Sequence, residues 1–196
     1  MHNVAALPTE PIETDTVGES EEEAWVQAAR GDPTAFAPLY HRYRERVFAY
    51  VRTRTSTIDD AMDLTQQIFL RALDALPQYR GQRDIFAAWL FRIARNAVTD
   101  YYRRRRVTIT WDLVPAALLP LAEGDPESDA LRRESLDRLR AALAALDPET
   151  RELLALRFGA RLTVGEIAAV VGKGEAATRK KLARTLHTLA DHLGGA

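Results

Sequence analysis

The residues best suited to chemistry form a row of arginines, with one asparagine, in the stretch 85–106. Arg92, Arg95, Asn96, Thr99, Arg103 and Arg106 recur at intervals that place them on one face of a helix. Guanidinium groups pair with phosphates, and an asparagine amide hydrogen-bonds base edges. The stretch also ends in four consecutive arginines, Arg103–Arg106, which is more positive charge than a helix dipole requires. The row therefore indicates a nucleic-acid contact. A solvated face with a basic C-terminus fits the same spacing.

The stretch Gln78–Asp84, which precedes this helix, has a second composition suited to nucleic acid. It contains Tyr79, Arg80 and Arg83 together with side-chain amides. Aromatic rings stack on unpaired bases, while arginines and amides hydrogen-bond to them. The stretch therefore indicates a site for an unpaired base, although polar surface turns commonly have the same composition.

The stretch 57–76 is predicted to be a helix with one apolar and one acidic face. The acidic and amide side chains that lie off the apolar stripe are Asp59, Asp60, Asp63, Gln66, Gln67 and Asp74. Phe69 and Leu70 are both large and adjacent, so they cannot both lie on one narrow stripe. Such a face with an extra aromatic residue is typical of a protein-docking surface. A solvated face with Phe69 at the edge of the core explains the pattern equally well.

The stretch 163–192 is predicted to be a helix-turn-helix unit. Thr163 and Glu166 have the spacing of a capping box, and Gly172 falls where the first helix should end. The outward positions of the second helix are Ala177, Lys180, Lys181 and Arg184, and all three lysines of the chain lie in or beside this helix. A short basic second helix suits the major groove of DNA. A generic helical hairpin is the alternative.

The sequence contains no pattern for catalysis or metal binding. It has no cysteine, and its histidines, His2, His41, His187 and His192, have no metal-binding spacing with carboxylates. Neither a Gly-rich phosphate loop nor a Gly-x-Ser-x-Gly turn occurs. We therefore expect a protein that is not an enzyme and that uses no metal and no cofactor. Because no apolar run is long enough to span a bilayer and no signal core is present, we expect a cytoplasmic protein without membrane insertion.

Helical periodicity runs through most of the chain and predicts an all-α protein of two small helical domains. Helices are expected over 22–30, 34–54, 57–76, 85–106, 134–146, 148–158, 163–171 and 175–192. The acidic leader 1–20 has no apolar pattern and is expected to be disordered. Residues 107–133, which contain prolines and a glycine, are expected to form a flexible linker between domains at 21–106 and 134–193.

The net charge of −1 conceals a strong segregation of charge. Residues 1–23 carry seven acids and no base, and residues 107–134 have a net charge of −4. Residues 24–106 have a net charge of +7, and residues 135–196 have a net charge of +3. Two basic blocks with acidic segments before and between them favour polyanion-binding domains, and unevenly distributed surface charge is the simpler alternative.

Three blocks of the sequence together resemble the bacterial RNA polymerase sigma factors of the sigma-70 family. Asp60–Ala72 (DAMDLTQQIFLRA) is similar to region 2.2, Phe86–Asn96 (FAAWLFRIARN) with Asp100 and the arginines is similar to regions 2.3 and 2.4, and Glu166–Gly172 (EIAAVVG) is similar to region 4.2. The blocks occur in the family's order and, with their flanking helices, cover about residues 21–106 and 134–193. Because no room is left for region 1.1 or a folded region 3, the chain resembles the compact extracytoplasmic-function (ECF, group 4) members.

The resemblance implies a role for each surface described above. Docking on the clamp helices of the largest polymerase subunit would involve Asp63, Gln66, Gln67, Phe69 and Arg71. Binding of the minus-10 element, with a base flipped from the nontemplate strand, would involve Tyr79, Arg80, Arg83, Arg92, Arg95, Asn96, Arg103 and Arg106. The minus-35 element would be bound by Ala177, Lys180, Lys181 and Arg184. Core RNA polymerase and promoter DNA are the implied partners, and an anti-sigma factor commonly holds such proteins inactive.

The chain departs from the family pattern at two places. Met62 and Gln67 stand where region 2.2 usually has glutamates, and the lost charge at Gln67 predicts weaker polymerase docking. The triplet Ala176-Ala177-Thr178 stands where Gly-Thr-Val is usual. We expect Thr178 to weaken the packing of the last helix, and Ala177 lacks a hydroxyl for DNA.

The alternative function is a helix-turn-helix regulator that binds DNA without joining polymerase. Such a regulator would need neither the face around Asp63 and Phe69 nor a loop for an unpaired base. Binding to core polymerase separates the two functions.

Overall fold

The chain is helical throughout the part that the structure describes. The computed structural model describes residues 19–81, 85–105 and 126–194, with side chains over 20–81, 85–104 and 136–191. The helices are α1 (Glu19–Gly31), η1 (Pro33–Phe36), α2 (Ala37–Arg52), α3 (Ile58–Ala75), η2 (Leu76–Gln78), α4 (Phe86–Arg105), α5 (Pro126–Ala145), α6 (Pro148–Leu154), the π-helical turn η4 (Ala155–Gly159), α7 (Val164–Val171) and α8 (Glu175–Gly194). The described ranges contain no strand, which confirms the predicted all-α class.

Local hydrogen bonds explain where several helices begin and end. The Thr57 side chain accepts a hydrogen bond from the backbone N–H of Asp60 at the start of α3. The predicted capping box of α7 is present: the Glu166 backbone N–H donates to Thr163 Oγ1 over 3.2 Å, and the Thr163 N–H donates to Glu166 Oε2 over 2.7 Å. Helix α7 ends at Gly172, whose left-handed backbone (φ 69°) favours glycine.

Helix α5 begins inside the stretch that the sequence analysis assigned to the linker. It starts at Pro126, whereas the expected helix started at 134. Proline is favoured in the first helical turn, and acidic residues there complement the helix dipole. The residue types that indicated a linker therefore also suit a helix N-terminus, and the linker prediction over 126–133 is wrong. The rest of the predicted linker, 107–125, and residues 1–18 of the leader lie outside the described residues.

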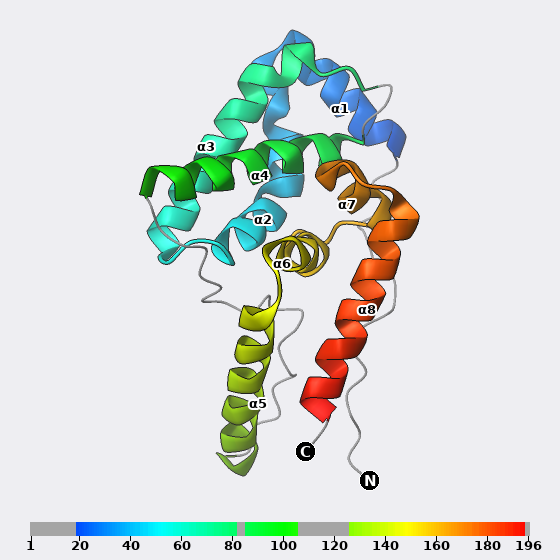
Figure 1. Ribbon diagram of the computed structural model, residues 1–196. Coiled ribbons are helices and arrows are strands. Elements are labelled where there is room, and N and C mark those ends of the chain that lie inside the picture. The colour runs from blue at the N-terminus through cyan, green and yellow to red at the C-terminus, as the bar shows by residue number, and fades with distance from the viewer. Residues whose placement is uncertain (1–18, 82–84, 106–125, 195–196) are drawn as a thin grey trace.

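The helices form two units, which we call the N-terminal unit (α1–α4) and the C-terminal unit (α5–α8). In the N-terminal unit, α2 packs against α1, α3 and α4. In the C-terminal unit, α5 and α8 lie side by side, and α7 packs on α8 (Figure 1). The largest fully buried side chains come from both units and include Leu39, Tyr43, Tyr50, Phe91, Leu143, Leu153, Leu154 and Leu156.

The two units pack directly against each other. Helix α7 lies against α4 (Figure 1), and η4 contacts α2. The buried apolar side chains of both units form one continuous cluster. Arg46 Nε of α2 donates a hydrogen bond to the backbone oxygen of Ala160 over 2.8 Å. Gly159 lies so close to α2 that a Cβ atom there would be 3.4 Å from the Cα atom of Tyr50. The sequence pattern predicted two domains on a linker and did not indicate this contact.

Candidate nucleic-acid and protein interfaces

Helix α4 has one buried apolar face and one cationic face. The buried side chains are those of Phe86, Ala87, Ala88, Leu90, Phe91, Ala94, Ala97 and Val98. On the other face, Arg95, Asn96 and Thr99 are exposed and Arg92 is half-buried, so the predicted row does share one surface. An exposed row of guanidinium groups with an amide can contact both phosphates and base edges.

The C-terminal end of α4 is joined to α3 by the carboxylate of Asp100. Its two oxygens accept hydrogen bonds from Arg71 of α3 over 3.4 Å and from Arg103 over 3.2 Å. Arg103 is nevertheless 80% exposed, and Arg104 is exposed as well. Exposed ion pairs contribute little free energy, so both arginines stay available to a polyanion. The side chain of Arg71 links two helices and is still 39% exposed, so its role in docking stays a prediction. Arg106 lies outside the described residues.

The structure corrects the prediction for Tyr79. Its ring is only 7% exposed and packs at centroid distances of 5.0 Å from Trp89 and 5.9 Å from Phe86. Burial among aromatic neighbours stabilises the ring more than exposure to water. In this arrangement the ring has no free face for an unpaired base. Arg80 is exposed beside it, and Arg83 lies outside the described residues.

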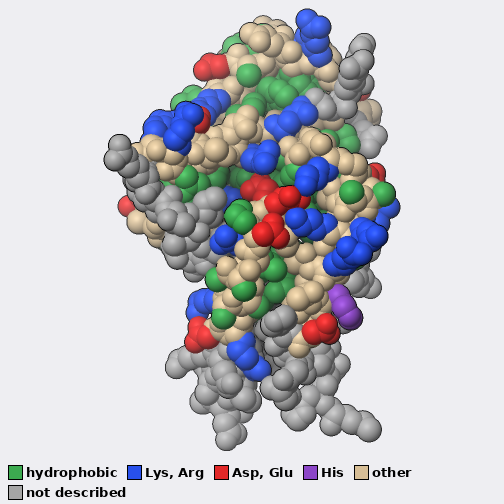
Figure 2. Space-filling view, in the orientation of Figure 1, with side chains coloured by type: hydrophobic (Ala, Val, Ile, Leu, Met, Phe, Trp, Pro, Cys, Tyr) green, Lys and Arg blue, Asp and Glu red, His purple; other side chains and the backbone are tan. Residues whose placement is uncertain are grey.

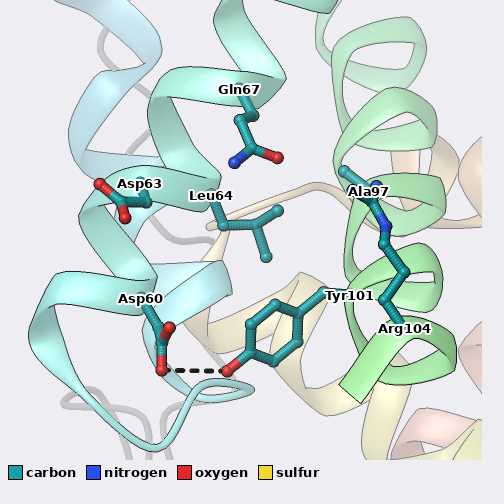
Figure 3. Close-up of a pocket in the computed structure, with 7 residues that line it drawn as sticks. All are labelled: Asp60, Asp63, Leu64, Gln67, Ala97, Tyr101 and Arg104. Atoms are coloured by element: carbon teal, nitrogen blue, oxygen red, sulfur yellow. Dashed lines mark hydrogen bonds between the residues drawn. The ribbon is translucent and has the colours of Figure 1, made fainter. Parts of the chain in front are cut away.

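A polar pocket of about 220 Å³ lies between α3 and α4. Its lining residues are Asp60, Asp63, Leu64, Gln67, Ala97, Tyr101 and Arg104 (Figure 3). The Tyr101 hydroxyl donates a hydrogen bond to Asp60 across the pocket over 3.1 Å. Asp63 and Gln67 are exposed on α3, as predicted for a docking face. The sequence pattern does not connect this face with α4, because the two stretches are far apart in the chain.

The structure also corrects the prediction for Phe69. Its side chain is buried, and its ring makes edge contacts with Phe36 and Tyr40. The α3 stripe is thus wide enough to bury Phe69, while the adjacent Leu70 is exposed. This arrangement matches the alternative that placed Phe69 at the core edge.

An apolar groove of about 400 Å³ between α2 and α3 was missed by the sequence analysis. Tyr40, Arg44, Glu45, Phe48, Met62, Thr65 and Gln66 line it. Met62 is 58% exposed, although its side chain is large and apolar. Exposed apolar side chains within a charged rim are typical of a protein interface. The sequence interpretation considered only that Met62 replaces a glutamate. The signal for this groove was the large apolar side chain at an exposed position of α3.

Helix α8 presents the predicted outward row. Ala177, Lys180 and Arg184 are exposed, and Lys181 is half-buried. Thr178 is buried, and its hydroxyl donates to the backbone oxygen of Gly174 over 3.1 Å. The hydroxyl is therefore satisfied within the helix, and the expected loss of packing at Thr178 is offset by this bond.

Two of the three lysines in or beside α8, Lys173 and Lys181, pair with carboxylates at the start of α6. Lys173 Nζ lies 2.5 Å and Lys181 Nζ lies 3.0 Å from Glu149 Oε1, and Lys181 Nζ lies 3.6 Å from Asp147 Oδ1. Hydrogen bonding from Thr150 lowers the pKa of Asp147, and hydrogen bonding from Lys173 lowers that of Glu149. Both carboxylates are therefore charged at neutral pH.

Basic side chains gather on the face of the molecule that carries α4 and on the side that carries α8, with acidic side chains between them (Figure 2).

The described side chains contain no group of three or more histidine, aspartate or glutamate residues that could hold a metal ion. None of the described helices is long and apolar enough to cross a membrane. The candidate binding surfaces among the described residues are the cationic faces of α4 and α8, and the polar pocket and apolar groove beside α3.

Comparisons with known proteins agree with these surfaces. A family described as Sigma-70 region 2 matches residues 39–108, and one described as Sigma-70, region 4 matches residues 142–191. The chain is 35% identical to the ECF RNA polymerase sigma factor BldN of Streptomyces coelicolor over 167 residues, which cover 84% of this chain and 62% of BldN. It is 32% identical to the ECF RNA polymerase sigma factor SigD of Mycobacterium tuberculosis over 183 residues, which cover 90% of this chain and 85% of SigD.

A solved structure has a similar fold. It contains CnrH in complex with the cytosolic domain of CnrY and matches with a TM-score of 0.58 and 28% identity, over 87% of this chain and 95% of that chain. CnrH is an RNA polymerase sigma factor of Cupriavidus metallidurans. Since both family regions occur in order on the two units and the similarity to SigD extends over most of each protein, the chain belongs to the ECF RNA polymerase sigma factors of the sigma-70 family.

Proposed function

We propose that the chain directs core RNA polymerase to promoters, with the N-terminal unit binding the minus-10 element and the C-terminal unit binding the minus-35 element. The observation that carries this proposal is the presence of two exposed cationic faces, one on α4 and one on α8, which belong to different units. Two separate faces suit two separate stretches of DNA, whereas a regulator with one helix-turn-helix needs only the second.

The face of α4 is assigned to melted minus-10 DNA. Arg95 and Arg103 would bind phosphates, and Asn96 would contact a base edge beside Arg92. Arg80 would act from the neighbouring loop. Tyr79 would act indirectly, because its ring packs on Trp89 of α4 and so fixes the position of the neighbouring Arg80. A base extruded from the duplex costs a few kcal/mol, which these contacts must offset.

The α3 surface is assigned to core polymerase. Asp63, Gln66 and Gln67 supply exposed polar groups, and the groove at Met62 supplies apolar area next to them. An apolar centre with a polar rim is the usual composition of a protein interface. We further propose that the chain acts in the cytoplasm, and that a regulatory protein binds it as the cytosolic domain of CnrY binds CnrH.

Transcription in vitro tests the proposed function. The full chain is added to core RNA polymerase on a library of promoter fragments, and transcripts that start at defined sites are expected only when both are present. Absence of chain-dependent initiation contradicts the proposal. Binding to DNA without binding to core polymerase identifies a regulator that acts alone.

A matched pair of variants tests the docking surface. Asp63→Asn removes one exposed charge from α3 and should weaken binding to core polymerase several-fold, measured with labelled chain. Glu23→Gln removes one exposed charge from α1 and serves as the control. Equal affinities for the two variants would remove Asp63 from the interface.

A further inference from the structure

A single carboxylate of the C-terminal unit reaches into the N-terminal unit. The Tyr50 hydroxyl donates to Glu152 Oε1 over 2.8 Å, and Arg54 Nη2 donates to Glu152 Oε2 over 2.6 Å. Arg95 Nε of α4 lies 3.9 Å from Glu152 Oε1. The Glu152 carboxylate is thus surrounded by three donors from α2, from the residues that follow α2, and from α4.

The donors on the N-terminal unit are held in place by their own contacts. The Arg54 guanidinium lies 4.3 Å from the centroid of the Tyr50 ring, and it also donates to Thr53 Oγ1 over 3.3 Å. Arg54 is 4% exposed, and the backbone oxygen of Arg54 accepts a hydrogen bond from Tyr102 of α4. A buried guanidinium in a fixed position is a built site for an anion.

The protonation states favour binding of an anion. Burial raises the pKa of the Tyr50 hydroxyl well above its usual range, so it remains a hydrogen-bond donor. Burial acts to lower the pKa of Arg54, but Tyr50 and Glu152 outweigh it and the pKa is raised. Arg54 is therefore cationic while Glu152 occupies the site.

We propose that Tyr50, Arg54 and Arg95 form a phosphate site for promoter DNA, and that the Glu152 carboxylate occupies this site when the two units are closed. The inference rests on the proposed function. A carboxylate and a phosphate accept the same hydrogen bonds from guanidinium groups, and Arg95 belongs to the cationic face of α4. Glu152 thus joins the units and covers the site, so DNA and the closed arrangement compete for the same donors.

The competition predicts how the chain opens. Separation of the units withdraws the Glu152 carboxylate from the buried Arg54 guanidinium, and an anion that takes the place of this carboxylate restores the lost contact. A DNA phosphate next to Asn96 is such an anion. The hydrogen bond of Arg46 with the Ala160 oxygen also joins the units but has a neutral acceptor, so phosphate is not expected to displace it.

Fluorescence energy transfer within the full chain tests the closed arrangement. The sequence has no cysteine, so Gln27→Cys on α1 and His187→Cys on α8, both exposed, accept a dye pair selectively. Glu152→Gln keeps the shape of the side chain and removes its charge, and energy transfer should fall. Glu45→Gln removes one charge from an exposed glutamate of α2 and should leave energy transfer unchanged. Equal energy transfer in the two variants overturns the inference.

Binding of a labelled single-stranded oligonucleotide tests the phosphate site. Glu152→Gln should bind roughly threefold or more tightly than the unchanged chain, because apparent affinity rises with the open fraction. Arg54→Gln is then added to the Glu152→Gln variant, and Arg95→Gln replaces it if that combination does not fold. The added substitution should lower the slope of log K against log salt by about 0.7, for one lost phosphate contact. An unchanged affinity in Glu152→Gln, or an unchanged slope in the combined variant, overturns the site.

The outcomes separate this inference from the proposed function. If Glu152→Gln changes neither energy transfer nor DNA binding while the unchanged chain still directs initiation by core polymerase, only the inference fails. If no initiation depends on the chain, the proposed function fails whatever the behaviour of Glu152.

Discussion

Lys180 and Lys181, which are adjacent on α8 and alike in sequence, are expected to contribute unequally to DNA binding. Lys180 is exposed and forms no ion pair with the side chains that the structure describes. Lys181 lies beside Glu149 and Asp147, at 3.0 Å and 3.6 Å. The charge of Lys181 is therefore already balanced within the protein, whereas that of Lys180 is available to a phosphate.

The difference has a measurable size. Each phosphate contact on duplex DNA contributes about 0.9 to the slope of log K against log salt. Loss of the Lys180 contact should therefore reduce the change in affinity between about 50 and 200 mM salt by roughly 3.5-fold. Lys181→Ala should change the slope much less, because a lysine already paired with Glu149 and Asp147 neutralises little phosphate charge and releases few cations from the DNA.

Fluorescence anisotropy with a labelled duplex and the full chain measures both slopes. The phosphate term is independent of sequence, so the assay does not require the natural promoter. Arg140→Ala, which removes an exposed cation from α5, is the control for overall charge, and circular dichroism checks that each variant folds. Equal slopes for Lys180→Ala and Lys181→Ala, or a larger effect at Lys181, would refute the reasoning from ion pairing.

Three further predictions concern stability. Phe91 is fully buried with its ring 5.7 Å from that of Tyr50, so Phe91→Ala should lower the free energy of unfolding by about 3–5 kcal/mol in chemical denaturation, and a loss below 1 kcal/mol would contradict its core role. Thr163→Ala removes the acceptor for the Glu166 backbone N–H and should cost about 1 kcal/mol, with recovery in Thr163→Ser; failure of serine to restore stability would argue against the cap. The pKa of Asp147 is lowered in the folded state, so the stabilisation by its ionised carboxylate is complete above the ordinary pKa of 3.8 and disappears as pH falls through the lower folded-state pKa. Asp147→Asn should remove this loss of stability in acid. An unchanged acid-unfolding curve for the variant would contradict the prediction.

Local sequence patterns determined the helices and the chemistry of their faces. The period of 3.6 residues separates the buried residues of α4 from Arg95 and Asn96, and the spacing of Thr163 and Glu166 identifies the start of α7. These signals need only neighbours within one or two turns, which is why they can be found without a structure. The order of the three motif blocks was also sufficient to indicate the family, which the comparisons confirm.

Tertiary structure alone decided which side chains on those faces are free. Tyr79 and Phe69 are buried by rings from other helices, and Lys181 is neutralised by carboxylates of α6. Glu152 meets Tyr50 and Arg54 across separations of 102 and 98 residues. Periodicity shows that a face is apolar or charged but not which partner covers it, because the partner is selected by packing and electrostatics between segments that are distant in the chain.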